Sequence, residues 1–297
     1  MPAAITHYFH AQRVFEELKK SDPKFTVIQD AFFWGAQGPD FLYCYRFFPC
    51  RKDNILNEYG LRLHEDNPSK LFTAMREYFE ASGQKEILRS YLSGFLCHYS
   101  LDRTCHPFIR FETSILLKRQ SEQNESILHN EIESALDTIL LRYETGLLPI
   151  EFNLKKTVPK NKTVRSQIAD LYAFLLERLY GLTNAGVPLL QATSDCRKAF
   201  GLLNDRTTMK KALVERLEKK SGKRTYSCHF RSISEGDAFD YANILHSRWS
   251  WPIGCGNERE ESFLELYEQS VQESIAFIPA FFKTNDYGKL TGETPMF

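Results

Sequence analysis

Two pairs of residues in this sequence have the types and the spacing needed to bind a metal ion. His98 precedes Asp102 by four positions, and His129 precedes Glu133 by four positions. Four residues make about one turn of an α-helix, so the side chains of each pair point the same way if their segments are helical. Two helices that each present an imidazole and a carboxylate to a common core can hold one metal ion or two. The spacing therefore favours a metal-dependent hydrolase.

Both pairs lie on the apolar sides of segments with helical periodicity, at about 84–103 and 126–143. We therefore expect all four side chains to face inwards. A proline disfavours helical geometry at the residue before it, so Pro107 predicts a bend or a break at His106. A further helical pattern follows at about 108–118.

Apolar residues recur at helical spacing in nearly every other long segment, whereas strict alternation is scarce. The remaining helices are expected at about 4–20, 69–82, 166–180, 188–203, 208–220 and 259–282. Segment 155–165 is basic, lacks acids and contains a proline, which favours a linker or exposed loop over a phosphate-binding strip. The sequence thus predicts an all-α fold in one domain, 1–297. Residues 1–147 would form the metal-binding half, and residues 148–297 would add helices that pack on it.

The composition limits the class of protein. The 297 residues are 42% apolar, enough for a substantial core, and the 38 basic and 38 acidic residues cancel. Because the protein has no net positive charge to attract a polyanion, we expect no stable nucleic-acid partner. The sequence has no apolar run of about 18 residues and no recognisable secretory signal, so we expect no transmembrane segment and a cytoplasmic protein. Its seven cysteines lack paired spacing, which favours free thiols.

Histidines are concentrated in the first half of the chain. Six of the eight precede residue 130: His7, His10, His64, His98, His106 and His129. With Asp40, Asp102 and Glu133 they supply enough donors for two or three four-coordinate ions. Mixed imidazole and carboxylate ligands favour zinc, leave manganese, iron and nickel open, and disfavour calcium.

Several neighbouring residues have a simpler structural explanation. Core packing is favoured for the eight aromatic residues within 32–48 and for Cys97 and Cys105. His10 is expected to be solvated. Trp249 and Trp251 either form a lid over the site or anchor a surface loop, and the sequence leaves both explanations open.

The candidate ligands occur in an order that is known from one family. Thr6-His7, Gly38-Pro39-Asp40, His64, His98 with Asp102, His106, and His129 with Glu133 resemble the pattern of the zinc-dependent phospholipases C. That family shares its all-helical fold with the S1/P1 nucleases. The resemblance covers about residues 1–145 and implies a multi-helix bundle with its metal site between helices.

The resemblance also implies a role for each residue. Asp40, His64, His98 and Asp102 would surround one zinc; His106, His129 and Glu133 would hold a second; and His7 with Asp102 would approach a third. Asp40 would also be the catalytic general base. Secreted family members complete the third site with an N-terminal tryptophan amine, whereas this chain starts with Met1. We expect two zinc ions. The third site is either lost or completed by the amine of Met1, by the Pro2 amine after methionine removal, or by water.

The resemblance and the ligand types together predict a zinc-dependent phosphoester hydrolase, in which a hydroxide bridging two zinc ions about 3.5–4 Å apart attacks phosphorus in line. A phospholipid phosphoester is the first substrate hypothesis, and a nuclease or a small-molecule phosphatase of the same fold stays open. So does a metal-stabilised helical interaction module without turnover, in which protein would fill every coordination position. The groups that orient the imidazoles are expected among Glu65, Asp66, Tyr99 and Arg103.

Overall fold

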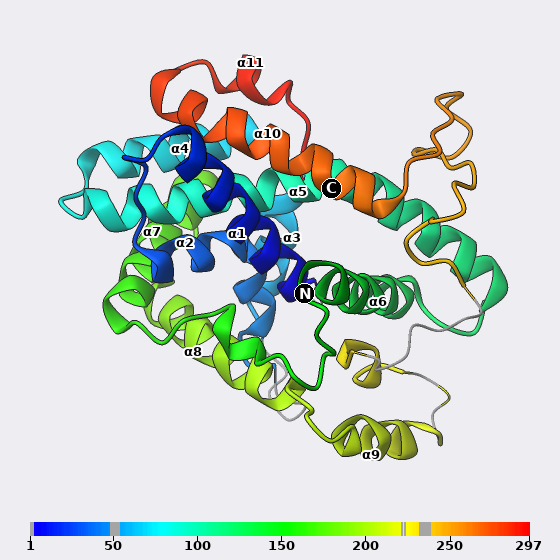
Figure 1. The fold of residues 1–297 in the computed structure, drawn as a ribbon. Helices are drawn as coiled ribbons and strands as arrows, with labels where there is room; N and C mark the ends of the chain where they lie inside the picture. Colours follow the sequence, from blue (N-terminus) through cyan, green and yellow to red (C-terminus); the bar gives the residue numbers. More distant parts are fainter. Residues whose placement is uncertain (1–2, 48–53, 221, 223, 232–238) are drawn as a thin grey trace.

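The computed structural model describes residues 3–47, 54–220, 222, 224–231 and 239–297. These residues form α-helices α1 to α11 and three short 3-10 helices, with no strand among them. Figure 1 shows how the α-helices are arranged. An isolated bridge pairs Trp249 with Arg259 in the loop before α10. The all-α prediction is confirmed.

The long helix α5, Lys85–Arg119, runs through the middle of the fold (Figure 1). Its most extensive contacts are with four helices: α1 (Ala4–Ser21), α2 (Gln29–Ala36), α6 (Glu125–Thr145) and α10 (Phe263–Lys283). These neighbours bury α5 on several sides. The candidate ligands of α5 therefore lie in the interior of the protein.

The predicted break at Pro107 is wrong, because α5 continues through this residue as one helix; the alternative of a bend stays a prediction. A proline inside a helix removes one hydrogen bond and costs about 3 kcal/mol. Cys105, Phe108 and Ile109 on either side of Pro107 are buried in the core. Burying each large apolar side chain contributes about 1.5–3 kcal/mol, which offsets the cost of keeping the proline in the helix.

Two glycines bring α2 and α5 into backbone contact. A Cβ atom at Gly35 would lie 2.0 Å from the carbonyl oxygen of Tyr91, and one at Gly94 would lie 2.0 Å from that of Phe32. No larger residue fits at either position without moving a helix. Because α2 leads directly into the 3-10 helix η1, Gly38–Cys44, this contact places η1 next to α5.

The remaining helices surround this centre. They are α3 (Asn57–Glu65), α4 (Pro68–Ala81), η2 (Leu154–Lys156), α7 (Lys162–Tyr180), α8 (Gly186–Leu203), α9 (Met209–Glu218), η3 (Ser227–His229) and α11 (Tyr287–Thr291). Segment 155–165 is only partly a loop, because it contributes to η2 and α7 and buries Thr157 and Val158. Helix α8 packs on η1 and α7 packs on α4. The single-domain organisation stays a prediction.

Six cysteines lie in the described residues, and all six are free thiols, as predicted; Cys50 lies outside the described residues. None of the helices in the described part of the chain combines the length and the apolar character required to cross a bilayer.

Candidate metal centre

The fold brings the eight candidate ligands together from five elements. They are His7 on α1, Asp40 on η1, His64 on α3, His98, Asp102 and His106 on α5, and His129 and Glu133 on α6. Their ligand atoms form three groups, each within 4.8 Å: His7, Asp40 and His98; His64, His98 and Asp102; and His106, His129 and Glu133. Asp40 and His129 have side chains that are 15% and 26% exposed, whereas the other six are buried.

Asp102 lies at the middle of this cluster. Its Oδ1 atom is 3.3 Å from His7 Nε2 and 3.5 Å from His106 Nδ1. Its Oδ2 atom is 3.1 Å from His98 Nε2 and 3.7 Å from His64 Nε2. The two oxygens thus face different imidazoles, an arrangement that suits a carboxylate shared between two ions.

The second helix pair supplies the other group. His129 Nε2 lies 3.3 Å from Glu133 Oε1, and His106 Nε2 lies 3.7 Å from the same oxygen. Because α5 is unbroken at Pro107, His98, Asp102 and His106 follow one another at intervals of four on one helix face. His106 therefore links the two groups, with one ring nitrogen towards each carboxylate.

His7 is more closely integrated than the resemblance implied. Its ring stacks on the ring of His98, with centroids 4.3 Å apart, and its ligand atoms group with those of Asp40 and His98 as well as approaching Asp102. Met1 and Pro2, whose amines are two of the alternatives for completing the third site, lie outside the described residues.

Backbone carbonyls orient two of the imidazoles. The Nδ1 atom of His98 is 3.2 Å from the oxygen of Ala36, and that of His64 is 2.7 Å from the oxygen of Gly60. A proton on Nδ1 is needed to donate to a carbonyl, so each Nε2 atom keeps its lone pair, and these two atoms lie 3.3 Å apart. The groups predicted for this task have other partners in the structure: Tyr99 donates to the oxygen of Thr294, Arg103 approaches Glu273, Glu65 approaches Arg110, and Asp66 approaches Arg62.

The glycine of the Gly38-Pro39-Asp40 motif has a steric role. Its φ of +51° lies in the left-handed region, and a Cβ atom would lie 2.3 Å from Cδ2 of His98. Glycine at this position lets the backbone turn against the imidazole ring. The turn places Asp40 beside His64, where Oδ1 is 3.2 Å from Nε2.

The electrostatics of the cluster favour a bound cation. Burial lowers the pKa of His7 and of His106 to about 4, so both rings are neutral, which is the ligating form. Burial and the charges of Asp40 and Glu133 raise the pKa of Asp102. Buried carboxylates among neutral imidazoles carry negative charge that is costly unless a positive charge offsets it. The donor set therefore fits zinc.

Asp137 is a positioning residue that the sequence analysis missed. Its Oδ1 atom accepts hydrogen bonds from the N–H and the hydroxyl of Thr6, both at 2.8 Å, and its Oδ2 atom accepts one from Arg231 Nε at 3.0 Å. Asp137 lies on α6, the helix of Glu133, and caps the first turn of α1, the helix of His7. Its sequence signal is its place four residues after Glu133, on the same face of α6.

The structure tests three expectations about residues near the candidate ligands. His10 is buried against Tyr267, so the prediction that it is solvated is wrong. Cys97 and Cys105 are core thiols, as predicted. Core packing is likewise confirmed for aromatic residues such as Phe32, Trp34 and Phe41, whereas Phe48 lies outside the described residues.

The tryptophan loop is anchored on α5. The buried ring of Trp249 packs against Phe108, and its indole N–H donates to the oxygen of Glu261. Trp251 is only half-buried and lies near Arg110. The contacts of Trp249 are those of a loop anchor.

The C-terminal segment covers part of the candidate metal centre. The ring of Phe297 lies 4.6 Å from the ring of His64 and 4.5 Å from that of His106. The N–H of Met296 donates to the oxygen of His64 at 2.9 Å. This contact had no signal in the sequence, because the segment is about 190 residues away from His106 along the chain.

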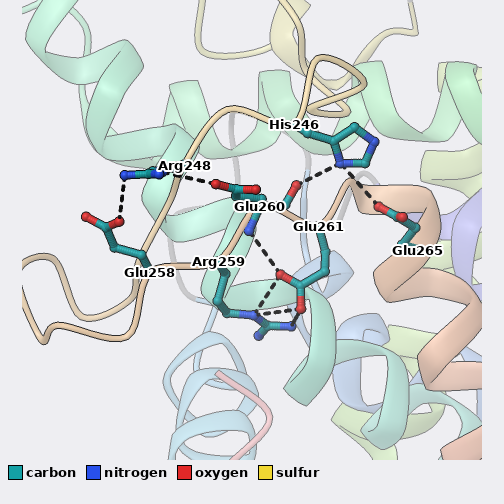
Figure 2. A pocket seen from close by; sticks show the side chains of 7 residues that line it. All are labelled: His246, Arg248, Glu258, Arg259, Glu260, Glu261 and Glu265. Atoms are coloured by element: carbon teal, nitrogen blue, oxygen red, sulfur yellow. Dashed lines mark hydrogen bonds and ion pairs between the residues drawn. The ribbon is translucent and has the colours of Figure 1, made fainter.

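A surface pocket of about 540 Å³ lies elsewhere, at the loop before α10 (Figure 2). Its charged side chains pair with one another: Arg248 lies 3.3 Å from Glu258 and 3.0 Å from Glu260, and Arg259 lies 3.0 Å from Glu261. None of its lining residues belongs to the candidate centre. Exposed ion pairs of this kind contribute little to stability and provide no reactive group.

An all-helical bundle with buried imidazoles and carboxylates converging from several helices is the architecture of a metal-dependent enzyme. The family model described as zinc dependent phospholipase C matches residues 6–185, and the chain belongs to this family. The match includes all eight candidate ligands. Comparisons with curated proteins and with solved structures found no match.

Proposed function

We propose that the protein is a zinc-dependent phosphoester hydrolase that uses two zinc ions and has phospholipids as its preferred substrates. The observation that carries the proposal is the convergence of four imidazoles on the buried carboxylate of Asp102. One ion would be held by Asp40, His64, His98 and Asp102, and the other by His106, His129 and Glu133.

Asp40 is proposed as the general base. It is the most exposed of the three carboxylates, with 15% of its side chain accessible, compared with 4% for Asp102 and 5% for Glu133. When bound, zinc lowers the pKa of a water molecule and offsets charge on the phosphoryl oxygens. Asp40 Oδ1 can accept the proton of the attacking water, and the turn at Gly38 places the carboxylate beside His64.

The family supports a phospholipid or a related phosphoester as substrate. A nuclease or a small-molecule phosphatase of the same fold remains the alternative. Purified protein loaded with zinc should therefore be assayed on a phosphatidylcholine analogue, on single-stranded DNA and on p-nitrophenyl phosphate. We expect the phospholipid to be hydrolysed fastest. Faster hydrolysis of DNA or of the monoester would replace this substrate assignment.

The role of Asp40 is tested by Asp40→Asn, with the zinc content measured by elemental analysis. Loss of a general base lowers turnover by about 10²–10⁴-fold. The matched control is Asp66→Asn, an exposed carboxylate just after the helix that carries His64, which should leave activity and zinc content unchanged. A wild-type protein that retains full zinc and hydrolyses no phosphoester would instead be a metal-stabilised interaction module.

A further inference from the structure

Helix α9 presents a row of apolar side chains to solvent. Met209, Leu213 and Leu217 are 72%, 58% and 69% exposed, and no residue of α9 is buried. Their spacing of four places them along one face of the helix. Figure 1 shows α9 at the edge of the fold, beside η3. Singly exposed apolar residues are common, whereas an aligned row on one short helix indicates a binding surface.

Polar contacts hold α9 in place with this row facing outwards. At its N-terminal end, Lys210 Nζ donates to the carbonyl oxygens of Leu202 and Asn204, at 3.0 and 2.9 Å. At its C-terminal end, the carboxylate of Glu218 accepts the N–H groups of Tyr226 and Ser227. The apolar row takes no part in these contacts.

The charges around the row are basic. Arg216 lies next to Leu217 in sequence, and Lys219 and Lys220 follow the end of the helix. Within the part of the chain that the structure describes, none of these three has a carboxylate within 4.0 Å.

The acidic residues of this region point elsewhere. Asp205 accepts the N–H of Lys211, and Glu218 is bound to η3. Glu215 lies about 160° around the helix from Leu213. The outer face of α9 thus combines apolar side chains with cations that are free to meet anions.

We propose that this face of α9 docks on an anionic phospholipid surface. The side chains of Met209, Leu213 and Leu217 would enter the boundary between headgroups and acyl chains, and Arg216, Lys219 and Lys220 would bind lipid phosphates. A helix with an apolar row bordered by basic residues has the amphipathic character of interfacial helices. Each basic residue near an anionic membrane contributes about 1 kcal/mol to binding.

The same charges disfavour a second copy of the chain as the occupant. A symmetric dimer through α9 would bring together two patches that each carry Arg216, Lys219 and Lys220, because a two-fold interface pairs a patch with itself. Like charges in contact oppose such an interface. The docking inference rests on the proposed function in that phospholipid is the proposed substrate, but binding to vesicles does not require hydrolysis.

The test is co-sedimentation of zinc-loaded protein with phosphatidylcholine vesicles, with and without phosphatidylglycerol. All proteins carry Asp40→Asn so that the lipid stays intact. We expect binding that requires phosphatidylglycerol and weakens with salt. Leu213→Asp, and separately the double change Lys219→Glu with Lys220→Glu, should each reduce vesicle partitioning by at least about tenfold.

Matched controls distinguish α9 from the rest of the surface. Val187→Asp introduces the same charge at an apolar residue of α8 that is 81% exposed, and Lys160→Glu with Lys162→Glu reverses two other exposed lysines. Both should bind like the parent protein. Partitioning that is absent, or that the controls reduce as much as the α9 changes do, overturns the inference. So does a dimer in light scattering that Leu213→Asp dissociates without any vesicle binding.

Hydrolysis of a soluble phosphodiester separates this inference from the proposed function. With Asp40 intact, Leu213→Asp should hydrolyse bis-p-nitrophenyl phosphate at the wild-type rate, because α9 contributes no ligand to the candidate centre. Vesicle binding through α9 without any phosphoester hydrolysis would leave the docking surface standing and refute the proposed function. Phosphoester hydrolysis without α9-dependent vesicle binding would refute the docking surface and leave the proposed function standing.

Discussion

The change Asp102→Asn should have different effects in the metal-free and the zinc-loaded protein. In the metal-free protein, burial and the neighbouring Asp40 and Glu133 raise the pKa of Asp102 and favour its neutral acid. Asparagine has nearly the same shape and is also neutral. We therefore expect the free energy of unfolding in the presence of a chelator to change by no more than about 1 kcal/mol.

With zinc the same substitution should be costly. Asp102 has an oxygen within 3.7 Å of a nitrogen of each of four histidines, so it is positioned to be shared between ions. Even loss of a group that only supports a ligand weakens metal binding about 10–100-fold. A hundredfold loss of affinity removes about 2.7 kcal/mol of the stabilisation that saturating zinc provides.

Denaturant unfolding, measured once with chelator and once with buffered zinc, checks this prediction. Asp137→Asn is the matched control, because Asp137 is also a buried aspartate but pairs with Arg231 rather than with imidazoles. Loss of the carboxylate charge beside the buried guanidinium should cost about 3–5 kcal/mol in both conditions. Equal destabilisation of Asp102→Asn with and without zinc would refute the reasoning and make Asp102 a structural residue only.

Three further predictions concern the surroundings of the candidate centre and a distant carboxyl group. Phe297→Ala removes ring packing worth about 1 kcal/mol and should speed zinc transfer to a coloured chelator about fivefold; an unchanged rate would mean that the ring does not restrict access. Gly38→Ala forces a side chain into left-handed backbone against His98. It should lower the free energy of unfolding in denaturant by at least about 1–2 kcal/mol and should also weaken zinc binding. Burial, reinforced by Asp240, raises the pKa of Glu112 from 4.5 to about 7, so the folded protein binds a proton that the unfolded chain releases, and stability falls as pH rises through this window. Glu112→Gln should therefore be more stable than wild type by about 2 kcal/mol near pH 8, with no advantage below pH 4.5; a parallel pH dependence of the two proteins would contradict this.

The pairing of the candidate ligands on common helix faces was predictable because helical spacing is local. Intervals of four residues put His98 with Asp102 and His129 with Glu133 on common faces whatever the rest of the fold does. The interruption expected at Pro107 failed because a local preference of about 3 kcal/mol was outweighed by burial of the residues around it. Tertiary packing decides such cases, and a single sequence carries no direct signal of it.

The orientation of the ligands was not predictable for a related reason. The groups that fix His98 and His64 are the carbonyls of Ala36 and Gly60, and any residue type provides a carbonyl. The prediction of polar side chains nearby in sequence is wrong for these two rings, because those side chains have other partners. What places the carbonyl of Ala36 is the close contact of α2 with α5 at Gly35, whose purpose is apparent only once the two backbones are seen together.

The centre is consequently built on backbone placement as much as on ligand identity. The α2–α5 contact positions both the carbonyl that orients His98 and the turn at Gly38 that carries Asp40. A change that separates these helices should therefore weaken metal binding without removing any ligand. The structure thus predicts that packing substitutions at Gly94, which contacts no candidate ligand, act on zinc affinity through the position of η1, and competition with a chelator measures this directly.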